Sequence, residues 1–150
     1  MEWKGVSGAG VKRTQHEFLP MVCSMTKPQI VILHTGGNDL ASVPAGALRH
    51  RLTELAMLVQ ASLPSIMVIW SDMLPRLSYR GAKDDKAVNV KRESVNRYVQ
   101  NFMAKNNMRA IRHSAISWAD EGAFPYDGVH LSDTGNKRFQ QELWRSEERR

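Results

Sequence analysis

An aspartate and a histidine stand three residues apart near the end of the chain, in the stretch Asp127-Gly128-Val129-His130. At this spacing the Asp127 carboxylate can accept a hydrogen bond from one imidazole nitrogen of His130, which leaves the other nitrogen free to take a proton from a nucleophile. Gly128 lets the loop bend so that the two side chains can meet. A surface loop with a lone histidine is the alternative interpretation. The stretch is therefore a candidate acid–base pair that needs a partner hydroxyl.

A second candidate group is the stretch Gly36-Gly37-Asn38-Asp39, which follows an apolar run. An asparagine amide held on a tight turn at the end of a strand can donate a hydrogen bond to the oxyanion that forms on a substrate carbonyl. The alternative is an ordinary strand-to-helix turn, in which a glycine supplies a positive φ and Asn38 or Asp39 binds nearby backbone.

Metal and thiol chemistry are less favoured. His34 and His130 with Asp39 and Asp127 could form a ligand set, but the sequence has no H-x-x-x-H or H-E-x-x-H spacing. Cys23 is the only cysteine and lies in an apolar stretch, so we expect a buried thiol and no intramolecular disulfide. No metal and no cofactor is expected.

The composition is that of one globular domain spanning residues 1–150, with a charged tail at 145–150. The chain has a mass of 17.0 kDa and a formal net charge of +6. Its basic residues form separate clusters with acidic residues among several of them, which favours a solvated surface over a nucleic-acid site. No apolar run is long enough to cross a membrane, and the first residues lack the apolar centre of a signal peptide, so the default expectation is a cytoplasmic protein.

The elements that must position these side chains alternate between strands and helices. Strands are expected at 30–33 and 66–70, because these runs are apolar and contain β-branched residues. A short third strand is expected at 108–112. A helix is expected from Ala45 to about Ser62, and Pro64 closes it. Helices are also expected around the residues that recur at helical spacing further along, which are Val95, Tyr98, Val99, Phe102 and Met103, and then Phe139 and Leu143 behind a Ser132 cap.

This alternation predicts an α/β fold with right-handed crossovers, a three-layer α/β/α arrangement around a parallel sheet in which the strands are buried on both faces. In such sheets the chemistry gathers at the carboxyl ends of the strands. We therefore expect Asn38 and the Asp127–His130 pair to meet there, with a substrate pocket built from the connection 71–85 and the loop 118–126.

Together, GGND after the first apolar strand and DGVH before the last helix resemble two motifs of the SGNH (GDSL-like) hydrolase superfamily, and the resemblance covers most of the chain. The runs IVILHTGGNDL, MVIWSDMLPR, VKRESVNRYV and DGVHLSDTGNKRF are also similar to esterase-type domains of vertebrate genomes, including retroelement-linked ones. The resemblance implies a flavodoxin-like SGNH hydrolase fold, a serine esterase activity on small acyl or ester substrates, and a Ser-His-Asp triad.

The resemblance also implies roles for individual residues. Asp127 would orient His130 as the general base, and Asn38 would donate to the oxyanion hole. The second motif of the family contributes a glycine N–H to the same hole, and Gly8 in WKGVSGAG matches it, although Gly5 and Gly10 stay open as alternatives.

The nucleophile of the family, the serine of a Gly-Asp-Ser turn, is absent from this sequence. By comparison the first strand of the fold is missing as well, so we expect a truncated chain whose strand at 30–33 has an unpaired apolar edge, a place where a partner or a second copy can associate. Ser7, Thr35 and Ser71 are candidate substitutes by location alone, and the nucleophile is left unknown.

Two functions remain in competition. The chain is either part of an esterase that is inactive or weakly active alone, or a non-catalytic binding or interaction module that retains the SGNH fold.

Overall fold

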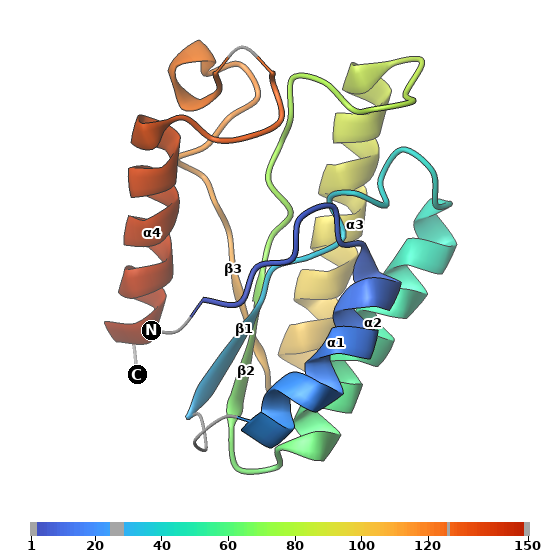
Figure 1. Cartoon of the computed structure of the whole chain (residues 1–150), viewed down its shortest axis with the longest axis vertical. Coiled ribbons are helices and arrows are strands. Elements are labelled where there is room, and N and C mark those ends of the chain that lie inside the picture. The colour runs from blue at the N-terminus through green and yellow to red at the C-terminus, as the bar shows by residue number, and fades with distance from the viewer. Residues whose placement is uncertain (1–2, 25–28, 126, 149–150) are drawn as a thin grey trace.

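The computed structural model describes residues 3–24, 29–125 and 127–148, and its centre is a three-stranded parallel sheet (Figure 1). The strands β1 (Ile30–Leu33), β2 (Met67–Ser71) and β3 (Arg109–Ile111) follow one another across the sheet in this order. Because the strands are parallel, their carboxyl ends lie at one edge of the sheet. The predicted α/β class and parallel sheet are confirmed.

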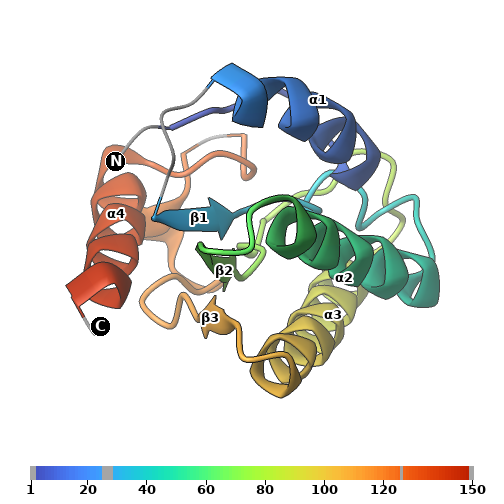
Figure 2. The same cartoon turned by 90° about the horizontal axis from the view of Figure 1, so that it is seen from below.

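Helices cover both faces of this sheet. On one face lie α2 (Ala45–Ser62) and α3 (Asp85–Lys105), with α1 (Val11–Ser24) beside α2 on the β1 side (Figures 1 and 2). The helix α4 (Asp133–Glu148) covers the other face, and a short 3-10 helix, η1 (Glu121–Ala123), packs against it.

The core has two parts because successive strand residues point to opposite faces. In β2, Val68 and Trp70 pack toward α2 and α3, whereas Ile69 packs toward α4, and all three are at most 1% exposed. By contrast, the first three residues of β1 are only half-buried, because none of the described residues forms a strand on its outer side. The prediction that the strands are buried on both faces is therefore right for β2 and wrong for β1.

Helix bounds follow local signals. The bounds of α2 are those predicted, and its buried residues form one stripe facing the sheet. Asp84 caps α3 by accepting from the Ala87 N–H at 3.0 Å. The predicted cap of the last helix is confirmed, since Ser132 Oγ accepts from the Gly135 N–H at 3.1 Å.

Three elements differ from the expectation. The helix α1 was not predicted, because Pro20 interrupts its pattern, and the Cys23 side chain lies outside the described part of the structure. In α3 the helix begins ten residues before Val95, and Tyr98 is 47% exposed with Arg49 over its ring. The charged residues from Arg145 through Glu148 continue α4, and 149–150 lie outside the described residues.

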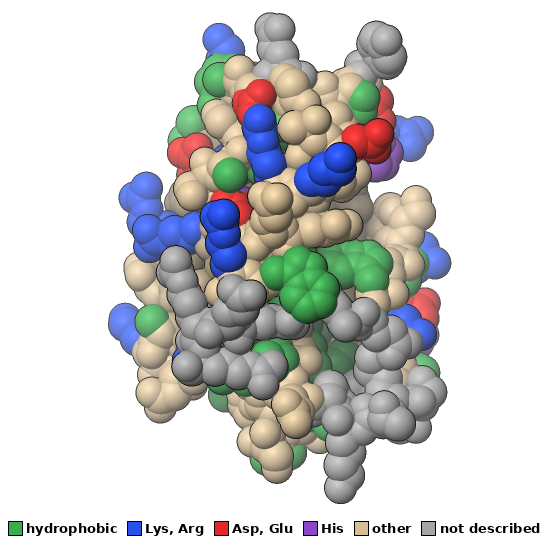
Figure 3. All heavy atoms as spheres, turned by 90° about the vertical axis from the view of Figure 1, so that its left-hand side faces the viewer, with side chains coloured by type: hydrophobic (Ala, Val, Ile, Leu, Met, Phe, Trp, Pro, Cys, Tyr) green, Lys and Arg blue, Asp and Glu red, His purple; other side chains and the backbone are tan. Residues whose placement is uncertain are grey.

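The face that carries α4 mixes hydrophobic side chains near its middle with scattered Lys, Arg, Asp and Glu (Figure 3). Within the described residues, no helix combines the length and apolarity required to span a bilayer.

Truncating the side chain of Leu52 should test the core that supports the carboxyl end of β1. Leu52 is 1% exposed and packs closely on Gly36, where a Cβ would lie 3.3 Å from Leu52 Cδ2. We expect Leu52→Ala to lower the free energy of unfolding by about 2–5 kcal/mol in urea titrations. The control is Met57→Ala on the same helix, which removes a side chain of a residue that is 44% exposed and should change it by less than about 0.5 kcal/mol. Equal losses in both variants would contradict this account.

Candidate functional site

Asp127 and His130 form a hydrogen-bonded pair on an exposed loop. The Asp127 Oδ2 to His130 Nδ1 distance is 2.5 Å, and Oδ1 accepts from the backbone N–H groups of Val129 and His130 at 2.9 and 3.0 Å. The bond to the His130 side chain, together with these backbone bonds, lowers the pKa of Asp127 from 3.8 to about 2. The carboxylate is therefore ionised at neutral pH and accepts from Nδ1, which leaves His130 Nε2 available as a proton acceptor.

Gly128 attaches this pair to the loop that follows β2. Its carbonyl accepts from the N–H groups of Leu77 and Ser78 at 2.7 and 3.3 Å. Its φ is +64°, and a Cβ at this position would lie 2.8 Å from the Leu77 Cβ. Both the conformation and the close approach require glycine.

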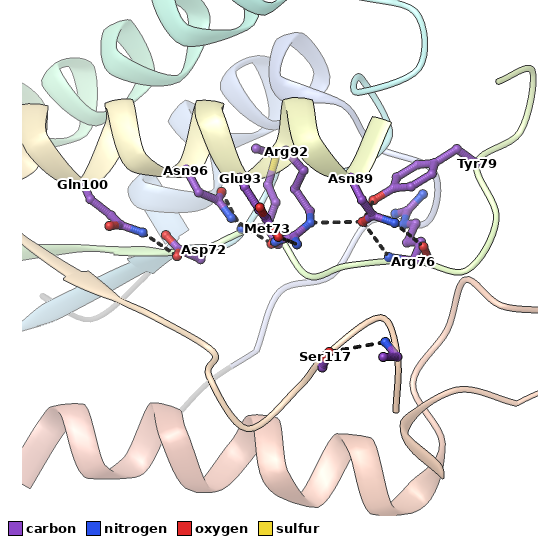
Figure 4. A network of polar contacts seen from close by, with 11 residues as sticks. Asp72, Met73, Arg76, Tyr79, Asn89, Arg92, Glu93, Asn96, Gln100 and Ser117 are labelled. Carbon is purple, nitrogen blue, oxygen red and sulfur yellow. Dashed lines mark hydrogen bonds and ion pairs between the residues drawn. The ribbon is translucent and has the colours of Figure 1, made fainter. Parts of the chain in front are cut away.

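The loop after β2 is itself held by a row of polar side chains on α3 (Figure 4). The Asn96 amide binds both the N–H and the carbonyl of Met73, each at 3.0 Å. About two turns closer to the helix start, the Asn89 amide binds the carbonyl of Arg76 at 2.8 Å and its N–H at 3.4 Å. Between them Arg92 donates to the Met73 carbonyl at 3.0 Å. These three side chains are 3–8% exposed, so the loop is fixed by buried hydrogen bonds.

The Gly36–Asp39 turn joins three segments of the chain. Asn38 Oδ1 accepts from Arg76 Nη2 at 3.1 Å, and Asn38 Nδ2 donates to the Ala9 carbonyl at 3.0 Å. The Asp39 carboxylate accepts from the Val11 N–H at 2.8 Å and so binds the start of α1. These contacts fix the orientation of the Asn38 amide, whose second N–H makes no hydrogen bond with the described residues.

Asn38 and His130 line the same cleft, which has a volume of about 360 Å³. Its walls come from residues 3–6 and Ala9, one side of α1, the end of β1, the loop after β2, and α4. Met73, Leu74 and Arg76 represent the predicted connection 71–85, but no described residue of 118–125 lines this cleft. The predicted meeting of the two motifs therefore agrees with the geometry, whereas the loop 118–126 does not form the pocket as expected.

The candidate hydroxyls lie in three different environments. Thr35 lines the cleft, where its Oγ1 is 2.8 Å from Thr14 Oγ1. Ser7 is exposed and does not line the cleft, and Ser71 is fully buried at the end of β2. None of the described hydroxyls bonds to the side chain of His130, whose hydrogen bonds go to Asp127.

Gly8 is an exposed glycine with φ of +68°, one residue before Ala9, which accepts from Asn38. It does not line the cleft, whereas the alternative Gly5 does. The other alternative, Gly10, packs against the Asp39 carboxylate, 2.6 Å from where its Cβ would lie. The glycine donor of the oxyanion hole stays a prediction.

A second set of titratable side chains forms a chain of hydrogen bonds that starts at His34, which lines the cleft, and continues beneath it. The Glu142 carboxylate lies 2.8 Å from His113 Nδ1 and also accepts from the Ala115 N–H. Ser71 Oγ lies 2.7 Å from His113 Nε2 and 3.0 Å from His34 Nδ1. With both imidazoles neutral, Glu142 accepts from His113, His113 accepts from Ser71, and Ser71 accepts from His34. Burial, followed by the charge of His113, lowers the pKa of His34 to about 4, and burial also lowers the pKa of His113.

Sequence reasoning missed two parts of this site. Arg76 was expected only as part of the connection 71–85 that helps to build the pocket, with no role of its own. No role at the site was predicted for Asn89, Arg92 or Asn96. Their spacing of three and four residues puts them on one helical face, and this was the available signal. No group of three or more His, Cys, Asp or Glu among the described residues could hold a metal ion.

The half-buried His34 and the buried His113 predict a pH-dependent stability. Because the folded-state pKa of His34 is about 4, below the 6.5 of a free histidine, the unfolded chain binds more protons between these values. The free energy of unfolding should therefore rise with pH from about 4 to about 6.5, and His34 should contribute up to about 3 kcal/mol of that change. Asp72, whose pKa burial raises to about 6, acts in the opposite direction, so the comparison is made between variants.

His34→Gln should have a shallower rise than the unmodified chain in urea titrations across this pH range. His50→Gln, which changes an exposed histidine on α2, should keep the full slope. An unchanged slope in His34→Gln would contradict the neutral state of His34.

The comparisons with known proteins agree with this architecture. Residues 2–138 match the GDSL-like lipase/acylhydrolase family. No curated protein sequence matches the chain. Among solved structures, a GDSL-like lipase from Bacteroides thetaiotaomicron is 19% identical with a TM-score of 0.82, and the match covers 97% of this chain and 74% of that one.

Two further structures are similar. A family 3 carbohydrate esterase from Clostridium thermocellum is 20% identical, with a TM-score of 0.76 and coverage of 96% and 67%. A psychrotrophic esterase from Pseudoalteromonas is 14% identical, with a TM-score of 0.71 and coverage of 95% and 73%. At these identities the structural likeness shows the fold, and the family follows from the match over 2–138. The chain belongs to the GDSL-like lipase/acylhydrolase family.

Proposed function

We propose that this chain supplies the acid–base arm and one oxyanion-hole donor of a serine esterase that hydrolyses small acyl esters. The observation that carries the proposal is the Asp127–His130 pair facing the same cleft as the oriented amide of Asn38. A histidine base and an amide donor on one cleft are the two groups that ester hydrolysis needs besides a nucleophile.

In the proposed reaction His130 Nε2 takes the proton of a serine hydroxyl while the serine oxygen attacks the ester carbonyl. The ionised Asp127 stabilises the imidazolium that forms. Asn38 donates its second N–H to the developing oxyanion, and its bonds to Arg76 and Ala9 keep that N–H oriented at no cost during the reaction. His130 then returns the proton to the leaving alcohol, and water releases the acyl group by the same route.

The serine itself is proposed to come from outside these 150 residues, on a Gly-Asp-Ser turn. Two observations support this: the sequence contains no such turn, and no described hydroxyl contacts the His130 side chain. Thr35 is the one predicted substitute that lines the cleft, but its hydroxyl bonds to that of Thr14. The same lack of a hydroxyl at His130 favours the second candidate, a non-catalytic module that binds acyl ligands.

Hydrolysis of para-nitrophenyl acetate separates these functions. We expect the 150-residue chain to hydrolyse it at close to the buffer rate, and a chain extended upstream to include a Gly-Asp-Ser turn to hydrolyse it rapidly. In the extended chain His130→Ala should lower kcat/KM by at least about 1,000-fold, and Asp127→Asn by up to about 10,000-fold.

His50→Ala is the matched control, because His50 lies on the outer side of α2 with an exposed side chain. Three results would overturn the esterase proposal: an upstream sequence without the serine turn, an inactive extended chain, or activity that survives His130→Ala. Turnover by the 150-residue chain that Thr35→Ala abolishes would instead identify Thr35 as the nucleophile.

A further inference from the structure

Among the residues that the structure describes, the guanidinium of Arg76 has no counter-ion in the cleft. It donates one hydrogen bond, from Nη2 to Asn38 Oδ1 at 3.1 Å, and it lies over the Tyr79 ring at 5.8 Å from the centroid. None of the ion pairs among the described residues includes Arg76. Glu17 lines the same cleft but lies near Arg13. The guanidinium therefore has further N–H donors that find no acceptor within the described part of the chain.

The position of this guanidinium is built into the fold. The Asn89 amide holds the backbone of Arg76, and the same Oδ1 accepts from the Tyr79 hydroxyl at 2.8 Å (Figure 4). The Tyr79 N–H is in turn bound by the Asp85 carboxylate at 2.8 Å. On the other side the guanidinium packs on Gly37, where a Cβ would lie 3.1 Å from Nη2. Arg76 is thus held at its backbone by Asn89, along its guanidinium by the Tyr79 ring, and at its tip by Asn38. A long side chain that is already ordered in this way loses little entropy when it binds a ligand.

The surroundings of Arg76 make an anionic ligand favourable. Burial lowers the pKa of this arginine, which means that its charge has lost part of its hydration. A carboxylate or phosphate can replace that hydration with two parallel N–H···O bonds, which match the planar fork of a guanidinium. Apolar side chains line the cleft beside it, including Val6, Leu131 and Phe139.

We propose that Arg76 is the anion-binding group of the cleft and that the substrate is an ester that carries a carboxylate or a phosphate close to the reacting carbonyl. This inference rests on the proposed function, because the ligand is a substrate only if the protein is an esterase. The binding of the anion itself does not require turnover. Because Arg76 bonds to Oδ1 of Asn38, the anion binds beside the oxyanion donor. The aliphatic part of the ester then lies against the apolar wall of the cleft. Arg76 thus selects which ester is presented to His130.

The test is a nuclear magnetic resonance titration of the isotope-labelled 150-residue chain. The probes are monomethyl succinate and monomethyl phosphate, which carry an anion, and dimethyl succinate, which is neutral. Both anions should shift the amide signals of Gly36, Gly37 and Asn38 and the Nε–H signal of Arg76, and higher salt should weaken this binding. Dimethyl succinate should bind roughly 10- to 100-fold more weakly or not at all.

Three variants assign the effect to charge. Arg76→Gln keeps an amide donor for Asn38 but removes the cation, and it should weaken binding of both anions about tenfold or more. Arg76→Lys keeps the charge without the fork, so it should retain part of the affinity. Arg80→Gln, an exposed position four residues further along the same loop, should bind as the unmodified chain does. A well-dispersed spectrum of each variant establishes that it is folded.

Three results would each overturn the inference. These are equal binding of dimethyl and monomethyl succinate, unchanged binding of the anions in Arg76→Gln, and a lack of shifts with both anions. If only one of the two anions binds, that anion identifies the group recognised. Failure of the esterase proposal is seen separately, since it concerns the His130-dependence of hydrolysis. Selective anion binding by an inactive extended chain would leave Arg76 as the ligand-binding group and remove only the catalysis.

Discussion

The row of amides on α3 is the constraint on which the site depends. Asn96 and Asn89 each bind both backbone groups of one loop residue, so two side chains fix the path of the chain after β2. That loop then holds the site from both ends, because Arg76 orients Asn38 while Leu77 and Ser78 bind the Gly128 carbonyl beside Asp127. An unpaired buried amide costs about 1–3 kcal/mol, which makes any other loop path unfavourable.

The cleft and the layer beneath it show how burial separates two similar sets of residues. Ser71, His113 and Glu142 have the order and spacing of a catalytic triad, but Ser71 is 0% exposed and cannot reach a substrate. Asp127 and His130 make the same type of contact on an exposed loop, and His130 lines a cleft. The buried set tightens the packing of β1, β2, β3 and α4, and the exposed set is available for chemistry.

Electrostatics distinguish the anion and the cation near the cleft, Asp127 and Arg76. Asp127 accepts three hydrogen bonds, so its charge is stabilised by its own loop. Arg76 instead gives up hydration without gaining a carboxylate partner, and its charge remains available to a ligand. The chain as a whole carries a formal charge of +6, which adds a weak long-range attraction for anions.

Several local features were determined by the sequence itself. The apolar patterns located β1 and α2 within a residue or so, and the Ser132 cap located the start of the last helix. The order of strands and helices determined the parallel sheet, since these signals reflect regular backbone geometry. The candidate residues of DGVH and GGND could be named from the sequence because each motif is contained within four consecutive residues. Tertiary structure alone decided that Arg76 lies on Asn38, that Gly128 docks on Leu77 and that Ser71 is buried. Those contacts join residues 38 to 51 positions apart, or depend on which face of a strand meets a helix, and no local pattern encodes such distances.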